Sequence, residues 1–88
     1  MNEKNQQVEK IDKLLKVLRD DTSLDTDKKD EAIRNLSNVK EEISEQNEPD
    51  KSRIVGWLGK GREALQGLKL GNDVIEQAKE LFGSFGIQ

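Results

Sequence analysis

Apolar residues recur at intervals of three and four positions along most of the chain, which is the spacing of helices that bury one face. In the first half this stripe consists of Val8, Ile11, Leu14, Leu15, Leu18, Ala32, Ile33, Leu36, Val39 and Ile43. The pattern predicts one helix from about Glu3 to Arg19 and a second from Asp25 or Thr26 that frays through residues 45–48 and stops before Pro49. Because only about six residues connect them, we expect an N-terminal antiparallel helical hairpin.

Side chains that favour helix ends mark the other predicted boundaries. Both candidate first residues of the second helix can cap it, and Leu24 is placed to pack onto its first turns. Pro49 suits the first position of a third helix, where the N–H group that proline lacks would have no partner in any case. Further along, Gly71 predicts a helix end, and Asn72 predicts the cap of a fourth helix.

The chain changes character around Pro49. Residues 1–48 carry charge at most exposed positions, whereas residues 54–88 contain the only Trp, both Phe and all seven Gly. The third helix is expected to place on one face Ile54, Trp57, Leu58, Gly61, Leu65 and Leu68. The glycines within 56–61 either break this helix or allow another backbone to pack closely against it. A fourth helix is expected from about Asp73 to Phe85, and its apolar side comprises Val74, Ile75, Ala78, Leu81, Phe82 and Phe85.

The absence of any alternating apolar and polar stretch argues against strands. We therefore predict an all-α fold, a small bundle of three to four helices with the hairpin at its N-terminus. The 88 residues suffice for one domain. Within it, residues 1–48 form a charged helical hairpin, and residues 49–88 form an apolar helical region punctuated by glycine.

Charge and composition exclude several classes of partner. The formal net charge is −3, and residues 1–53 hold 11 Lys and Arg against 14 Asp and Glu, so no basic stripe is available for duplex nucleic acid. No apolar run approaches the roughly 20 residues that span a bilayer, so no membrane span is expected. The polar N-terminus does not resemble a secretory signal. We expect a cytoplasmic protein.

The chain contains no His, Cys or Tyr, so the common general base, thiolate nucleophile and imidazole ligand are missing. Its carboxylates fall on the polar faces of the predicted helices, where solvent surrounds them and gives them no special reactivity. The acidic run 20–31 could suggest a calcium loop, but Thr26 stands where glycine is needed, and Ala32 stands where the bidentate Glu belongs. We therefore expect no enzyme, no cofactor, no catalytic residue and no metal site.

The segment Gly56–Arg62 offers one alternative function. Its glycines could expose backbone N–H groups to a phosphate, and Gly59, Lys60, Gly61 and Arg62 would be the binding residues. The segment lacks the strand and the Ser or Thr of a P-loop. Close helix packing at the glycines is the competing interpretation. A nucleotide-binding or nucleotide-sequestering protein therefore remains the alternative hypothesis.

Several short stretches resemble a known kind of segment. The run Glu48–Ile54, the pair Trp57-Leu58 and the terminal run Phe82–Phe85 are similar to short helical segments at the C-terminal ends of bacterial proteins. Some of those proteins belong to abortive-infection and other anti-phage defence systems. The resemblance covers most of residues 8–86 and implies an oligomerising module rather than a catalyst.

The leading hypothesis is a non-enzymatic helical module for oligomerisation or protein interaction. A chain this short buries only about 60–65% of its unfolded surface, and two helices of low apolar content should not cover the apolar faces of two others. A homo-oligomer or a partner protein would then cover the remainder. The predicted partner-binding residues are Ile54, Trp57, Leu58, Leu65, Leu81, Phe82 and Phe85.

Overall fold

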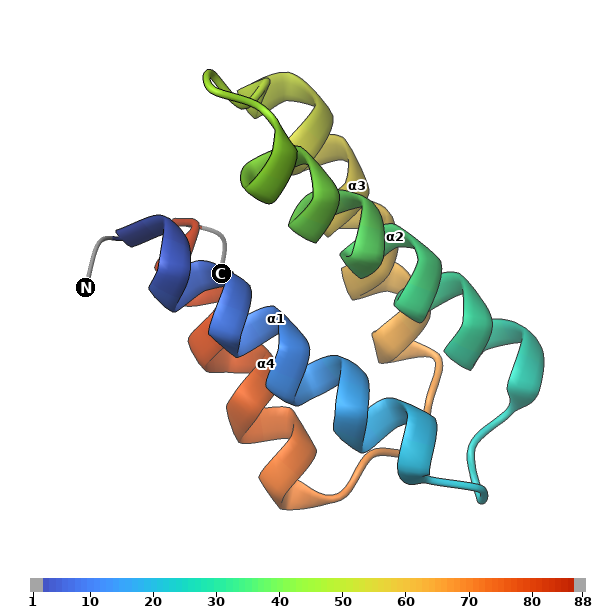
Figure 1. Cartoon of the computed structure of the whole chain (residues 1–88). Coiled ribbons are helices and arrows are strands. Elements are labelled where there is room, and N and C mark those ends of the chain that lie inside the picture. The colour runs from blue at the N-terminus through green and yellow to red at the C-terminus, as the bar shows by residue number, and fades with distance from the viewer. Residues whose placement is uncertain (1–2, 87–88) are drawn as a thin grey trace.

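The computed structural model describes residues 3–86 as four helices joined by short connections (Figure 1). They are α1 (Glu3–Asp20), α2 (Thr26–Glu45), α3 (Lys51–Gln66) and α4 (Asn72–Ser84). No strand occurs within this range. The predicted all-α helical bundle is confirmed, with four separate helices.

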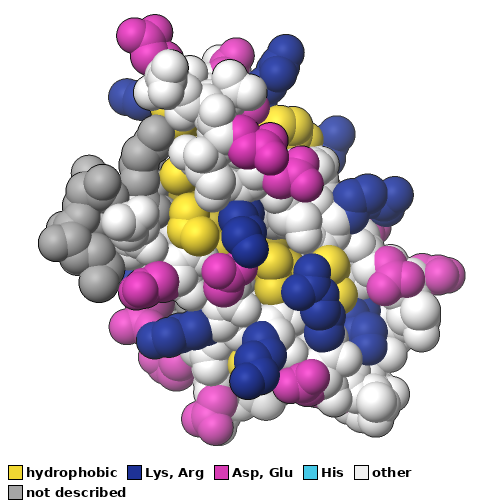
Figure 2. Space-filling model, in the orientation of Figure 1, with side chains coloured by type: hydrophobic (Ala, Val, Ile, Leu, Met, Phe, Trp, Pro, Cys, Tyr) yellow, Lys and Arg dark blue, Asp and Glu magenta, His cyan; other side chains and the backbone are white. Residues whose placement is uncertain are grey.

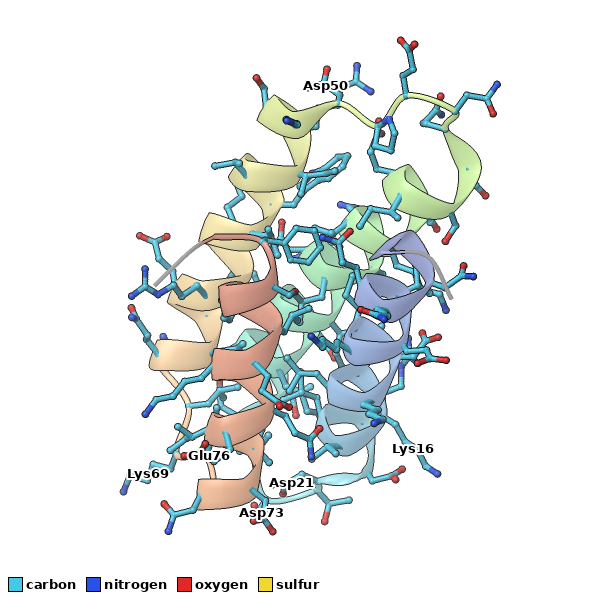
Figure 3. All side chains as sticks on the ribbon, turned by 90° about the vertical axis from the view of Figure 1, so that its left-hand side faces the viewer. Lys16, Asp21, Asp50, Lys69, Asp73 and Glu76 are labelled. Carbon is cyan, nitrogen blue, oxygen red and sulfur yellow. The ribbon has the colours of Figure 1, made fainter. Side chains whose placement is uncertain are left out.

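The helices pack in the order α3, α2, α1, α4. Close backbone contacts join α2 to α3, α1 to α2, and α1 to α4, whereas α3 and α4 are not a closely packed pair. The two connections 21–25 and 67–71 lie at the same end of the bundle in Figure 1. Figure 3 places Asp21 and Asp73 at that end and Asp50 at the opposite one. The α3/α4 side of the bundle is therefore the one that backbone packing leaves open.

One hydrophobic core runs through all four helices. Its largest side chains with no or almost no exposed surface are Ile11, Leu14, Leu15, Leu18, Leu36, Val39, Leu58 and Leu81. Complete burial of such a side chain stabilises the fold by about 1.5–3 kcal/mol. These residues belong to the apolar stripes read from the sequence, so the helical periodicity identified the core correctly.

Aspartate side chains cap the N-termini of α2 and α3. An Asp25 carboxylate oxygen accepts a hydrogen bond from the Lys28 backbone N–H at 3.1 Å, and Leu24 beside it is buried. The prediction that Pro49 opens the third helix is wrong, because Asp50 caps α3 by accepting from the Arg53 N–H at 3.2 Å. The Asp50 carboxylate satisfies a free N–H of the first turn, and Pro49 lies just before the cap rather than inside the helix.

The fourth helix also begins differently from the prediction. Gly71 occupies the cap position without a side-chain hydrogen bond, and Asn72 is already the first helical residue. The third helix ends before Leu68, which was expected on its face, although Leu68 is buried in the connection. The predicted end at Gly71 is therefore wrong, and the chain leaves α3 at Gly67.

The glycines of 56–61 do not interrupt α3. Gly61 is buried, and a Cβ added there would lie 3.4 Å from the Leu36 Cδ2 atom of α2. At Gly56 and Gly59 an added Cβ would meet nothing within 4 Å. Of the two sequence interpretations, the structure supports close packing, and it does so at Gly61 alone of these three positions.

The face that carries α1 and α2 is covered by charged side chains of both signs (Figure 2). Hydrophobic side chains reach this face only in small patches between them. None of the helices formed by residues 3–86 has the length and apolar character needed to cross a bilayer.

Candidate functional site

Most of the predicted partner-binding residues lie inside the bundle. Ile54, Leu58, Leu65, Leu81 and Phe82 are buried, while Trp57 and Phe85 are partly buried against the core. The expectation of a large uncovered apolar face in the C-terminal half is therefore wrong. Although the chain has few apolar residues, α1 and α2 concentrate theirs on inward faces and cover α3 and α4 efficiently.

Two large apolar side chains of the described residues nevertheless remain in solvent. Val55 of α3 is 56% exposed and Ile75 of α4 is 36% exposed. Val55 directly follows the buried residue Ile54, and Ile75 directly follows the buried residue Val74. Because successive helical residues point in different directions, both side chains lie away from the core. Both line hollows on the side of the bundle where α3 and α4 are not closely packed.

The larger hollow, which we call the Arg62 groove, has a volume of about 580 Å³. Its apolar lining consists of Leu65, Leu68, Leu70, Ile75 and Phe82. Arg62 and Gln66 border it from α3, and Lys79 borders it from α4. An apolar floor with a few polar groups at the edge is the usual composition of a binding groove.

The second hollow, the Val55 groove, has a volume of about 500 Å³. Residues of all four helices contribute to it, chiefly Ile54, Val55 and Leu58 of α3 and Phe85 after α4. Gly83 lines the first groove, and its neighbour Ser84 lines the second, so both hollows border the C-terminal end of α4. We call them together the α3/α4 seam.

The seam overlaps only in part with the predicted site. Leu65 and Phe82 line the Arg62 groove, whereas Trp57 and Leu81 line neither hollow. Sequence reasoning missed Val55 because it lies off the apolar stripe. A β-branched apolar residue beside a complete stripe is the signal that could have identified it.

The proposed phosphate segment lies within a continuous helix. Residues 59–62 are in the middle of α3, where backbone N–H groups donate to carbonyl groups one turn earlier. The side chains of Lys60 and Arg62 also differ in placement, since Arg62 borders the Arg62 groove and Lys60 does not. The geometry that would let glycines cradle a phosphate requires a loop, and this segment is helical.

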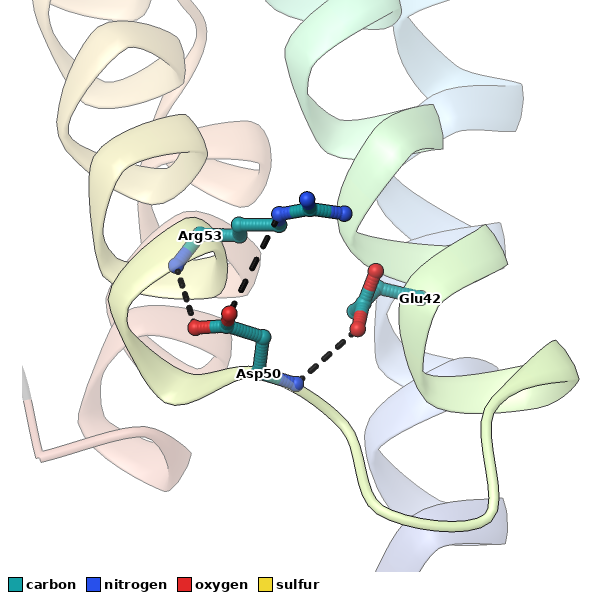
Figure 4. Close-up of polar contacts among 3 residues, drawn as sticks. All are labelled: Glu42, Asp50 and Arg53. Atoms are coloured by element: carbon teal, nitrogen blue, oxygen red, sulfur yellow. Dashed lines mark hydrogen bonds and ion pairs between the residues drawn. The ribbon is translucent and has the colours of Figure 1, made fainter.

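One carboxylate departs from the expected solvent-exposed placement. Glu42 of α2 is 9% exposed, and its Oε2 atom accepts a hydrogen bond from the Asp50 backbone N–H at 2.9 Å (Figure 4). Asp50 in turn caps α3 and forms a long ion pair with Arg53 at 3.9 Å. The prediction that all carboxylates lie on solvated faces is wrong for Glu42, which holds the α2–α3 connection in place.

The acidic run near the first connection is used for local structure. An Asp21 carboxylate oxygen accepts hydrogen bonds from the Ser23 hydroxyl at 2.5 Å and the Ser23 N–H at 2.9 Å. The hydroxyl first, and then the N–H, hold the pKa of Asp21 below its usual value. Across residues 3–86, no three His, Cys, Asp or Glu side chains come together as metal ligands.

Comparison with known proteins returns no match to a protein-family model, a curated protein or a solved structure. A function for the chain therefore depends on the geometry of the α3/α4 seam.

Proposed function

We propose that this chain is a non-enzymatic protein-interaction module that receives an amphipathic helix along the α3/α4 seam. In this proposal α1 and α2 form the antiparallel hairpin predicted from the sequence and serve as the scaffold. The hairpin supports α3 and α4, and these two helices present the seam to the partner.

The observation that carries the proposal is the placement of Val55 and Ile75. They are the large hydrophobic residues exposed in the described part of the chain, and each lines one of the two hollows. Exposed apolar side chains that gather at a concave surface are typical of interaction sites. Their burial by a partner would release water from apolar surface at about 25 cal/mol per Å².

An amphipathic helix fits the shape of this surface. The seam is bordered by two helices and extends from the 67–71 connection to the start of α3. A helix laid between two others anchors in such a groove through apolar side chains spaced at i, i+3, i+4 and i+7. The bacterial anti-phage setting, the cytoplasmic location and self-association remain predictions from the sequence.

A synthetic helix tests the proposal. The probe is a fluorescently labelled peptide of about 14 residues with leucine at the anchoring positions and glutamine at the flanking ones. We expect it to bind the full chain, and we expect Val55→Gln and Ile75→Gln each to weaken binding about tenfold, as measured by fluorescence anisotropy. Ile33→Gln is the matched control, because Ile33 is partly buried on α2 and lines neither groove.

Thermal melts of the three variants ensure that each is folded at the temperature of the titration. Equal weakening by Ile33→Gln and Ile75→Gln would show that the peptide does not occupy the seam. No binding to the unaltered chain would contradict the proposed function altogether.

A further inference from the structure

The charged side chains that the structure places along the seam, within its described residues, all have the same sign. Arg62 and Lys79 border the Arg62 groove, and Lys51 borders the Val55 groove. Among the side chains that the structure describes, no Asp or Glu lines either hollow, although the chain as a whole has 18 acidic and 15 basic residues. The surface that remains open to a partner is therefore locally cationic in an acidic protein.

These cations are also free to pair with a partner. Within the part of the chain that the structure describes, the ion pairs join Lys40 to Asp12 and Arg53 to Asp50. Arg62 and Lys79 take part in neither pair, and they approach the same groove from two different helices. A ligand placed between them would find an apolar floor and a positive charge on each side.

Resting on the proposed function, we infer that the helix bound by the seam carries acidic residues along both edges of its apolar stripe. Its apolar side chains contact Ile75 and Phe82, and its carboxylates pair with Arg62 and Lys79. The planar guanidinium of Arg62 can hold a carboxylate by two parallel hydrogen bonds, which fixes orientation as well as sign. Such complementary charge mainly raises the association rate and rejects partners of the wrong sign.

A partner protein suits this surface better than a second copy or a lipid bilayer. Two seams related by a two-fold axis would bring Arg62 and Lys79 of one copy toward the same cations of the other, which is repulsive. An anionic bilayer would meet the acidic residues Glu76 and Glu80, which are exposed on α4 beside Lys79, and an overall charge of −3. A narrow acidic helix can reach the cations while avoiding those carboxylates.

Three peptides that share one leucine stripe test the charge preference. Their flanking residues are Glu, Gln or Lys, and their outward faces are identical. At low ionic strength the Glu peptide should bind the unaltered chain about tenfold more tightly than the Lys peptide. The ratio should approach one at about 0.5 M NaCl, because salt screens exposed charge pairs.

A double variant locates the preference. Arg62→Gln with Lys79→Gln should bring the affinities of the Glu and Lys peptides to within about twofold of each other. Lys16→Gln with Lys60→Gln should leave the preference intact, since both lysines are exposed and line neither groove. Each double variant removes two positive charges and takes the net charge from −3 to −5, so the pair controls for overall charge.

The outcomes separate the two proposals. Equal binding of all three peptides would overturn the inference of an acidic partner and leave helix docking in place. Equal loss of preference in both double variants would overturn it too, because net charge rather than Arg62 and Lys79 would then be responsible. If no peptide binds, both proposals fail. If the chain sediments as a dimer that Val55→Gln and Ile75→Gln dissociate but the Glu peptide does not, a second copy occupies the seam and the inference is wrong.

Discussion

The Glu42 carboxylate holds the backbone N–H of Asp50 at 2.9 Å, across the connection between α2 and α3 (Figure 4). Asp50 then accepts from the Arg53 N–H and starts α3. The Glu42 carboxylate thus positions Asp50, and the Asp50 carboxylate caps α3. These two hydrogen bonds fix the position of the N-terminal half of α3. This part of α3 forms one wall of the Val55 groove.

Replacement of Glu42 should destabilise the fold although Glu42 lies outside the core. Glu42→Ala leaves the Asp50 N–H without its partner, which costs about 1–3 kcal/mol of unfolding free energy. Glu42→Gln retains an acceptor oxygen and should cost less than half as much. Chemical denaturation measures both, with Glu41→Ala at the exposed neighbouring position as the control. Similar losses for the two alanine variants would mean that the hydrogen bond contributes nothing.

The same substitution at two glycines of α3 should have opposite effects. Gly59→Leu places its side chain in open solvent and replaces a poor helix former, which should stabilise the protein by about 0.5–1 kcal/mol. Gly61→Leu drives its side chain into Leu36 and should destabilise by about 1–3 kcal/mol. Gly61→Ala should be tolerated, because the added methyl group would lie at ordinary contact distance. Denaturation midpoints that fall equally for the two leucine variants would contradict the close α2–α3 packing.

Trp57 should contribute to stability rather than to peptide binding. It packs against the core but lines neither hollow, so Trp57→Ala should reduce the unfolding free energy by about 2 kcal/mol or more. At a temperature where the variant remains folded, its affinity for the leucine peptides should equal that of the unaltered chain. A tenfold loss of affinity in a folded Trp57→Ala variant would extend the binding surface to the other side of α3.

Stability should respond to the ionisation of Asp21. Because hydrogen bonds from Ser23 lower the pKa of Asp21 in the folded state, the ionised form favours folding. This contribution is present above the unfolded pKa and is lost as the pH falls through the folded pKa. Ser23→Ala should raise the pKa of Asp21 toward its usual value, as followed by carboxyl resonances in a pH titration. Ser44→Ala, on exposed α2 surface, should leave the pKa of Asp21 unchanged.

Helical periodicity predicted the elements and the core but not how the helices pair. The stripes containing Leu14, Leu36, Leu58 and Leu81 are local in sequence, and all four residues are fully buried. Asp25 as a cap was also readable, because a short acidic side chain before an amphipathic run has a definite local role. Pro49 misled because its fixed φ is compatible with a position just before the cap as well as just after it.

The seam could not be predicted, because it depends on which helices meet. Contacts of α4 with α1 join the two ends of the chain, and they leave α3 without a closely packed neighbour on one side. The local spacing of apolar residues around Val55 or Ile75 does not indicate which helices pack against each other. The burial of Glu42 likewise results from its approach to the Asp50 backbone, eight residues away, after the chain has turned.

Methyl resonances of Val55 and Ile75 provide the most direct measurement of helix docking at the α3/α4 seam. During titration with the glutamine-flanked leucine peptide, both methyl groups should shift along one binding isotherm. The methyl groups of Ile33, beside Asp30 and Arg34 in a separate hollow, should stay in place. Shifts at Ile33 without shifts at Val55 and Ile75, or no shifts at saturating peptide, would contradict the assignment of the seam as the binding surface.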